Sequence, residues 1–211
     1  MLPGLLLLFL SKKRKCRTVG RALFCFGLLF FSLYLIGEAA APLKEFSGVQ
    51  AWLLKLENPV RGAGAGALIT LLVQSSSAML GMVIKLAGKG LLTLPAAIAV
   101  MLGAELGTCS DTLLATAGRG RPALRTALFH LSFSLLSITL GLLLIRPFTA
   151  LVLALAGSAD VARQIAHAHE LFNVAGVLLF APLLPLCQRL LEAALPDTSE
   201  TKSRKSMAQA V

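Results

Sequence analysis

Long apolar runs separated by short polar segments make up most of this chain. A helix needs about 20 apolar residues to cross the hydrocarbon core of a bilayer, and four runs are of that length. They lie at residues 21–41, 91–117, 123–145 and 165–187. The pattern predicts an all-α integral membrane protein with about four transmembrane helices.

A further apolar run, at residues 62–86, is interrupted in its middle by Gln74, Ser75, Ser76 and Ser77. Each of these side chains would cost about 1–3 kcal/mol if buried without a hydrogen-bond partner. Contacts between membrane helices explain a single serine, but not four consecutive polar residues. Irregular backbone at membrane depth occurs only where it is buried in protein or lines a cavity. We therefore expect a re-entrant helical hairpin, which is also the candidate binding site.

Shorter segments complete the membrane region. Residues 42–61 mix charged and apolar positions around Trp52, which is typical of an amphipathic helix at the membrane interface. The Asn58-Pro59 pair is expected to end that helix, because proline disfavours helical geometry at the residue before it. Residues 148–156 cover only about half a bilayer and predict a second short re-entrant piece. Residues 1–10 are apolar but too short to span.

The basic residues predict the orientation in the membrane. The chain has a formal net charge of +10, and its lysines and arginines gather at residues 12–17, 119–125 and 202–205. Cytoplasmic loops of membrane proteins carry such clusters. All three clusters lie on one side only if the run at 62–86 enters the membrane and returns. We therefore expect cytoplasmic N- and C-termini in the cell membrane, here a bacterial inner membrane.

Three regions follow from this pattern. They are a basic N-terminal segment at residues 1–20, a membrane region at 21–190 and a polar tail at 191–211, which is expected to be disordered. An alternative interpretation makes residues 12–41 a secretory signal peptide. The membrane helix is favoured because every later run is also apolar and needs it as a partner.

Composition excludes several classes of function. Hydrophobic residues make up 56% of the chain and charged residues 14%, with a mean hydropathy of +0.80, whereas a soluble domain carries about 25% charged residues. No basic groove with interleaved aromatic residues is present, so a nucleic-acid partner is not expected. The four cysteines have neither C-x-x-C spacing nor a paired histidine, which argues against a zinc site or a disulfide framework.

A break in the hairpin would create a binding site from helix ends. Free backbone N–H groups carry partial positive charge and suit an oxyanion, while free carbonyl and hydroxyl oxygens suit a dehydrated Na⁺. Glu105 and Asp111 place carboxylates inside a predicted span, where ionisable groups are costly and usually functional. No lysine lies in these spans to hold an anion.

A competing hypothesis is an intramembrane hydrolase. It would use a serine of the 75–77 group together with His130 or His169. The sequence has no nucleophile elbow, and Glu170 flanks His169 instead of facing it as an orienting acid. Packing between helices is the simpler role for both histidines.

Three motifs in order resemble the type II Na⁺/phosphate cotransporter family and its bacterial relatives. They are Gln74-Ser75-Ser76-Ser77-Ala78, Gly103-Ala104-Glu105-Leu106-Gly107-Thr108 and His169-Glu170-Leu171-Phe172-Asn173. The hallmarks of that family are a QSSS hairpin, a following G-A-N-x-G-T-T stretch and an H-x-x-F-N segment. The resemblance covers about residues 22–186. It implies sodium-coupled transport of phosphate or a similar oxyanion by alternating access around the hairpin, with no enzymatic activity and no cofactor besides the coupling ion.

The resemblance also implies which residues bind. The anion would contact Gln74, Ser75, Ser76 and Ser77. The Na⁺ ligands would come from Gln74, Thr108, Asn173, Glu105 and Asp111.

The chain departs from the family in two respects. Family members carry two inverted repeats, each with a QSSS, so residues 21–190 resemble a single repeat. The chain would then act as a half-transporter that pairs with a second copy or a complementary repeat. Glu105, Cys109 and Asp111 replace the usual Asn and Thr residues, and carboxylates near the site would repel phosphate. This departure supports an alternative, a non-transporting membrane scaffold or degenerate half-copy.

Overall fold

The computed structural model describes residues 1–196, which form α-helices and two short 3₁₀ helices without any strand. Four of the helices in this range are long and apolar enough to cross a membrane. They lie at Arg14–Glu45, Leu94–Ala115, Arg121–Leu143 and Val161–Ala194. The prediction of an all-α membrane protein with about four transmembrane helices is confirmed.

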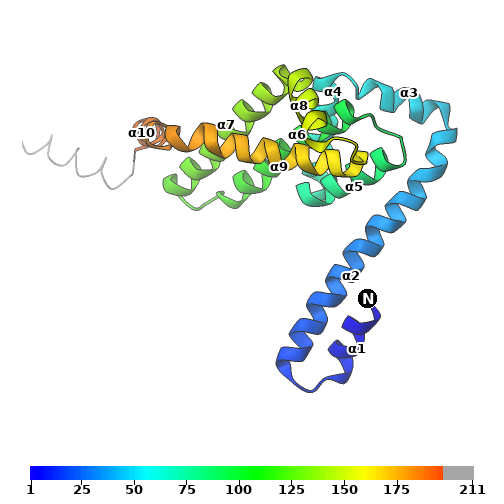
Figure 1. Ribbon diagram of the computed structural model, residues 1–211. Coiled ribbons are helices and arrows are strands. Elements are labelled where there is room, and N and C mark those ends of the chain that lie inside the picture. The colour runs from blue at the N-terminus through cyan, green and yellow to red at the C-terminus, as the bar shows by residue number, and fades with distance from the viewer. Residues whose placement is uncertain (197–211) are drawn as a thin grey trace, which may run out of the picture.

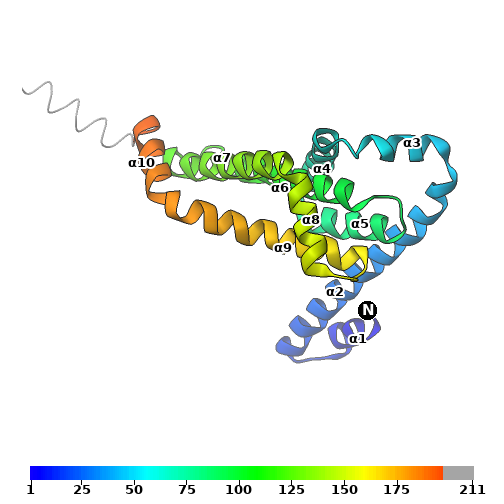
Figure 2. The same cartoon turned by 45° about the horizontal axis from the view of Figure 1, so that its top comes forward.

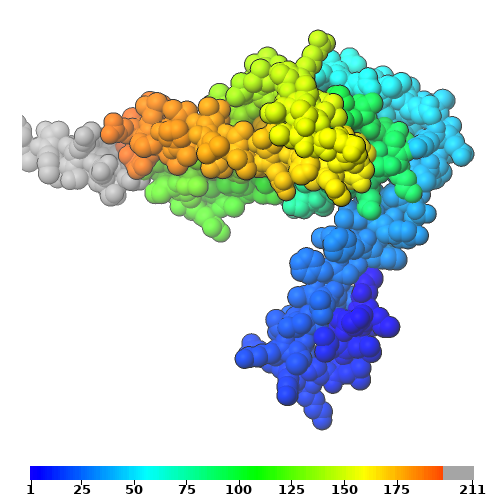
Figure 3. Space-filling view, viewed as in Figure 1, coloured from blue at the N-terminus to red at the C-terminus, as the bar shows by residue number. Residues whose placement is uncertain are grey.

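The N-terminal region is a helical hairpin that projects from the rest of the molecule (Figures 1 and 3). Helix α1 (Leu2–Leu10) packs along the first part of α2 (Arg14–Ala40). A methyl group on Gly4 would lie 2.5 Å from the backbone nitrogen of Phe24, so glycine is needed for this close approach. Helix α2 begins at Arg14 rather than near Arg21, which makes the basic cluster its first turns.

The segment before the QSSS hairpin forms two short helices instead of one amphipathic helix. They are η1 (Ala41–Glu45) and α3 (Ser47–Lys55). Asn58 lies beyond the end of α3 and caps the next helix, because its side-chain oxygen accepts hydrogen bonds from two backbone N–H groups, each at 3.1 Å. The Asn58-Pro59 pair therefore starts the hairpin, as an N-cap followed by proline commonly does.

The apolar run that follows consists of two helices, α4 (Pro59–Val73) and α5 (Ser76–Gly88). Ala65 and Ile69 of α4 lie with Met82 and Leu86 of α5 around one small cavity, so the two helices fold back on each other. The predicted helical hairpin is thus present, and its start is at Pro59.

Helix α6 (Leu94–Ala115) forms the centre of the molecule, and its residues 96–104 are all buried. Helix α4 crosses it at backbone contact distance, since methyl groups on Gly66 and Gly103 would lie 2.0 Å and 1.9 Å from the carbonyl oxygens of Val100 and Ala63. Small residues permit such approaches between membrane helices. The rest of the core comes from α5, from Leu56 and Leu92 at the two ends of the hairpin, and from the C-terminal half, which contributes Ile138, Ile145, Val152, Ile165 and Ala168.

Much of the C-terminal half extends away from this centre, while its residues 145–156 pack beside α6 (Figure 2). It contains α7 (Arg121–Leu143), α8 (Ile145–Ala156), α9 (Val161–Phe180), η2 (Ala181–Leu183) and α10 (Leu184–Ala194). The short helix α8 corresponds to the short apolar piece expected at 148–156. The tail predicted at 191–211 begins inside α10, and its residues 197–211 lie outside the described part of the chain.

Candidate functional site

The QSSS segment is the point at which the hairpin turns. Gln74 has φ 55° and ψ 33°, and within residues 1–196 no other residue except glycine has a positive φ. This left-handed residue stops α4, and its N–H donates the last helical bond to the Thr70 carbonyl at 2.7 Å. Ser75 is extended and begins α5 as its N-cap, where its hydroxyl accepts from the Ala78 N–H at 3.2 Å.

Each helix of the hairpin is too short to cross a bilayer. Helix α4 has 15 residues and α5 has 13, which corresponds to about 22 Å and about 20 Å. Both are shorter than a hydrocarbon core of about 30 Å. A hairpin of this size that enters from one side would turn before it reached the other side.

The turn leaves several backbone groups without helical partners. The first N–H groups of α5, including those of Ser76 and Ser77, have no carbonyl one turn earlier in the same helix. The last carbonyls of α4, those of Leu71, Leu72 and Val73, have no N–H group one turn later. A positive helix end and a negative helix end therefore meet at Gln74.

The register between α4 and α6 places Asp111 at the depth of this turn. The two helices run in the same direction, because Gly62 meets Ala99 near their starts and Thr70 meets Gly107 further along. Gln74 lies one turn beyond Thr70, and Asp111 lies one turn beyond Gly107. Asp111 is half-buried.

A polar contact joins α6 to α9. The Nε2 atom of His169 lies 3.1 Å from the Oε1 atom of Glu105, and both side chains are partly buried. The side chain of Asn173 is one turn further along α9, where its amide donates to the His169 carbonyl at 2.9 Å. The structure thus joins Glu105 directly to the H-x-x-F-N segment. The spacing of the motifs along the sequence does not indicate this contact.

The other predicted ligands make no hydrogen bonds to one another among the described residues. The Thr108 hydroxyl donates to the Ala104 carbonyl of its own helix at 3.2 Å. Gln74, Ser77 and Asn173 are exposed, while Ser75 and Ser76 are half-buried. Among the interactions of residues 1–196, none links a side chain of the 74–77 segment to Thr108 or Asn173.

The Ser–His pairing required for a hydrolase is not found. His169 contacts Glu105, as described above, and the Nδ1 atom of His130 lies 3.0 Å from the Thr112 hydroxyl. Within the described chain, neither histidine hydrogen-bonds a serine of the 75–77 group.

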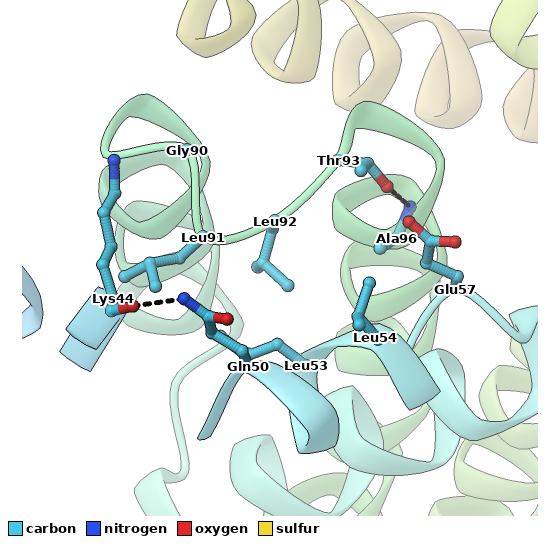
Figure 4. A pocket seen from close by; sticks show the side chains of 10 residues that line it. All are labelled: Lys44, Gln50, Leu53, Leu54, Glu57, Gly90, Leu91, Leu92, Thr93 and Ala96. Carbon is cyan, nitrogen blue, oxygen red and sulfur yellow. Dashed lines mark hydrogen bonds between the residues drawn. The ribbon is translucent and has the colours of Figure 1, made fainter. Parts of the chain in front are cut away.

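A cavity of about 470 Å³ lies at the opposite end of the hairpin from the turn (Figure 4). It opens between α3 and the segment that joins α5 to α6, and Gln50 donates there to the Lys44 carbonyl. Its lining includes Glu57, Thr93 and Leu92. No residue predicted to bind phosphate or Na⁺ lines it.

One polar residue near the turn was not predicted. Thr70 is fully buried on α4 and lies against Gly107. The only sequence signal for it is its spacing, because a residue four positions before Gln74 shares its helix face.

Comparison with known proteins identifies the family. The profile of the Na⁺/Pi-cotransporter family matches residues 45–181, which includes all three motifs. No solved structure matches the chain.

Curated relatives are longer than this chain. The protein YqeW of Bacillus subtilis is 31% identical over 197 residues, which cover 93% of this chain and 64% of that protein. The Escherichia coli (strain K12) "Putative inorganic phosphate export protein YjbB" is 27% identical over 196 residues, or 91% of this chain and 35% of that protein. Human sodium-dependent phosphate transport protein 2B is 30% identical over 131 residues, or 57% of this chain and 19% of that protein. The match to the family profile extends over more than half of the sequence, and the chain belongs to the Na⁺/Pi-cotransporter family.

Proposed function

We propose that this chain takes part in sodium-coupled transport of inorganic phosphate or a similar oxyanion across the membrane. The observation that carries the proposal is the left-handed break at Gln74, which divides one apolar run into two half-length helices. Relatives named for phosphate export and sodium-dependent phosphate transport support the choice of substrate.

The two helix ends suit two different ions. The N-terminal N–H groups of α5, with the hydroxyls of Ser76 and Ser77, would bind the oxyanion without a lysine. The terminal carbonyls of α4 would bind Na⁺, as half-helix ends do in other secondary transporters. The Asp111 carboxylate, level with the turn, would add negative charge on the side of the cation. Alternating access around the hairpin would then move both ions together.

The chain would act as a half-transporter. It spans 64% of its Bacillus relative and 35% of its Escherichia relative. Gln74, Ser77 and Asn173 are exposed in segments that this proposal places in the membrane, and lipid tails cannot complete their hydrogen bonds. A second copy of the chain or a complementary repeat would cover these side chains and complete the site.

We further propose that both termini lie on the cytoplasmic side of the cell membrane. The start of α7 and the end of α10 lie together, since the Nε atom of Arg125 donates to the Leu195 carbonyl at 2.8 Å. Arg121 donates to the Pro196 carbonyl beside it. The basic loop before α7 and the C-terminal end of α10 are therefore on one side of the molecule, which agrees with the positive-inside rule.

The experiment is flux of radiolabelled phosphate into membrane vesicles that contain the full chain, with and without a Na⁺ gradient. We expect Na⁺-dependent phosphate flux that falls about tenfold in Ser76→Ala, because a hydrogen bond to a charged ligand contributes about 1.5–3 kcal/mol. Ser32→Ala is the matched control, since Ser32 is exposed on α2 and its hydroxyl donates to the Leu28 carbonyl of its own helix. Equal Na⁺-independent flux in both variants would contradict coupling at this turn, and a lack of any flux would favour the membrane scaffold.

A further inference from the structure

Thr70 is a buried side chain without the usual partner of a helical threonine. The residue is 1% exposed, and its hydroxyl has no hydrogen-bond partner among the described residues. Helical threonines normally bond a carbonyl three or four residues earlier. Among residues 1–196, the threonine hydroxyls that donate four residues back are those of Thr18, Thr108, Thr126, Thr139 and Thr149. An unpaired buried hydroxyl costs about 1–3 kcal/mol, so its retention at Thr70 calls for a reason.

The position of Thr70 supplies one. It lies one turn before the break and on the same face of α4 as Gln74, and its own carbonyl accepts the last helical hydrogen bond at 2.7 Å. The three carbonyls that follow it, at residues 71–73, have no helical partner. A helical side chain tilts toward the N-terminus of its helix, so the Thr70 side chain lies against α6 on this last turn and not among those carbonyls.

Helix α6 packs directly against Thr70. A methyl group on Gly107 would lie 2.6 Å from the Cβ atom and 2.9 Å from the Cγ2 atom of Thr70. The absence of a side chain at Gly107 thus lets the backbones meet at this point. The next residue, Thr108, also carries a hydroxyl. Hard cations bind oxygen ligands of this kind, namely carbonyls and hydroxyls.

We propose that the Thr70 hydroxyl is a ligand of the Na⁺ ion that couples to transport, at the contact between α4 and α6. This inference rests on the proposed function, because it names a further residue of the same site. In this view the ion supplies the partner that the protein does not, and the ion joins α4 to α6 one turn before the break at Gln74. The hydroxyl is an ion ligand and makes no contact with the anion.

Thermal unfolding of the purified full chain in detergent tests the proposal without transport. We expect NaCl, compared with choline chloride, to raise the unfolding temperature of the wild type, because a ligand that binds only the folded state stabilises it. Thr70→Val should lose that increase and, without Na⁺, be at least as stable as the wild type, since the unpaired hydroxyl is gone. Thr70→Ser should keep the increase. Thr139→Val is the matched control, because Thr139 is exposed on α7 and bonds its own helix at 2.7 Å.

Flux measurements then distinguish this inference from the function on which it rests. In Thr70→Val we expect the Na⁺ concentration for half-maximal phosphate flux to rise about tenfold or more, the size of effect seen for residues that support metal ligands. A wild-type Na⁺ response in Thr70→Val would overturn the role of Thr70 and leave the proposed function standing. A wild type without Na⁺-dependent flux would defeat the sodium coupling itself. If Thr70→Val and Thr70→Ala both failed to fold while Thr70→Ser folded, the hydroxyl would be structural and the inference would be wrong.

Discussion

Gly103→Ala is expected to lower the unfolding free energy of this protein by more than about 3 kcal/mol, the upper end of the usual cost of overpacking. The added methyl group would lie 1.9 Å from the carbonyl oxygen of Ala63 and 2.5 Å from its carbonyl carbon. These are backbone atoms in the second turn of α4, so no side-chain rotation relieves the contact. Helices α4 and α6 would have to separate, and the hairpin would lose the support that fixes its depth.

Gly64→Ala is the matched control for this substitution. Gly64 is exposed on the same helix α4, and a methyl group there would meet nothing within 4 Å. Alanine is favoured over glycine in a helix by about 1 kcal/mol, so Gly64→Ala should raise the unfolding temperature. Thermal unfolding of both purified variants measures the difference. A Gly103→Ala variant as stable as the wild type would contradict the close packing of α4 on α6.

Replacement of Gln74 is expected to separate its backbone role from its side-chain role. A left-handed conformation costs a residue other than glycine about 1–2 kcal/mol, so Gln74→Gly should be more stable than Gln74→Ala by about 1 kcal/mol. Both variants lose the amide. If that amide hydrogen-bonds a charged ligand, the apparent affinity for phosphate should fall about ten- to hundredfold in both.

Phosphate flux at saturating Na⁺, together with thermal unfolding, checks both halves of this expectation. Gln188→Ala provides the control, because Gln188 is exposed on α10 and bonds Glu192 of the same helix at 2.9 Å. Wild-type flux in Gln74→Gly would mean that the amide does not contact the substrate. Equal stabilities of the glycine and alanine variants would mean that the backbone at residue 74 is not left-handed.

The sequence was sufficient to predict the hairpin, because four consecutive polar residues cannot continue an apolar membrane helix. The Asn58-Pro59 pair was interpreted as the end of one helix, while the structure uses it to start the next. That pair carries both signals, since a helix disfavours the residue before a proline and also favours asparagine then proline at its start. Only the packing of α4 on α6 decides between them.

Other features depend on contacts between distant residues. The Glu105–His169 contact joins positions 64 residues apart, and nothing in the local pattern of either helix indicates it. The packing of α1 on α2 depends on Gly4 and Gly20, where a methyl group would collide with the other helix. Nothing in the sequence around these glycines indicates that contact. Residues 14–21 form the first turns of α2, since lysine and arginine are good helix formers, so the helix begins inside the charge cluster and not after it.

The polar ligands expected from the motifs were only partly brought together. Asp111 lies level with Gln74 because α4 and α6 run in the same direction, and this follows from glycine contacts that a single sequence does not reveal. Thr70 was overlooked because one threonine in an apolar run is ordinary in a membrane helix. Its significance depends on its burial and its unpaired hydroxyl, which are three-dimensional properties.

Cysteine accessibility in intact cells and inverted vesicles tests the re-entrant hairpin most directly. Arg61→Cys and Lys89→Cys would be placed at the two ends of the hairpin, and Arg119→Cys in the loop between α6 and α7, in a chain whose four native cysteines are replaced by alanine. A membrane-impermeant maleimide should label the first two from the outside and the third from the cytoplasmic side alone. Labelling of Arg61→Cys and Lys89→Cys from opposite sides would show that residues 62–86 cross the membrane, and would contradict this account.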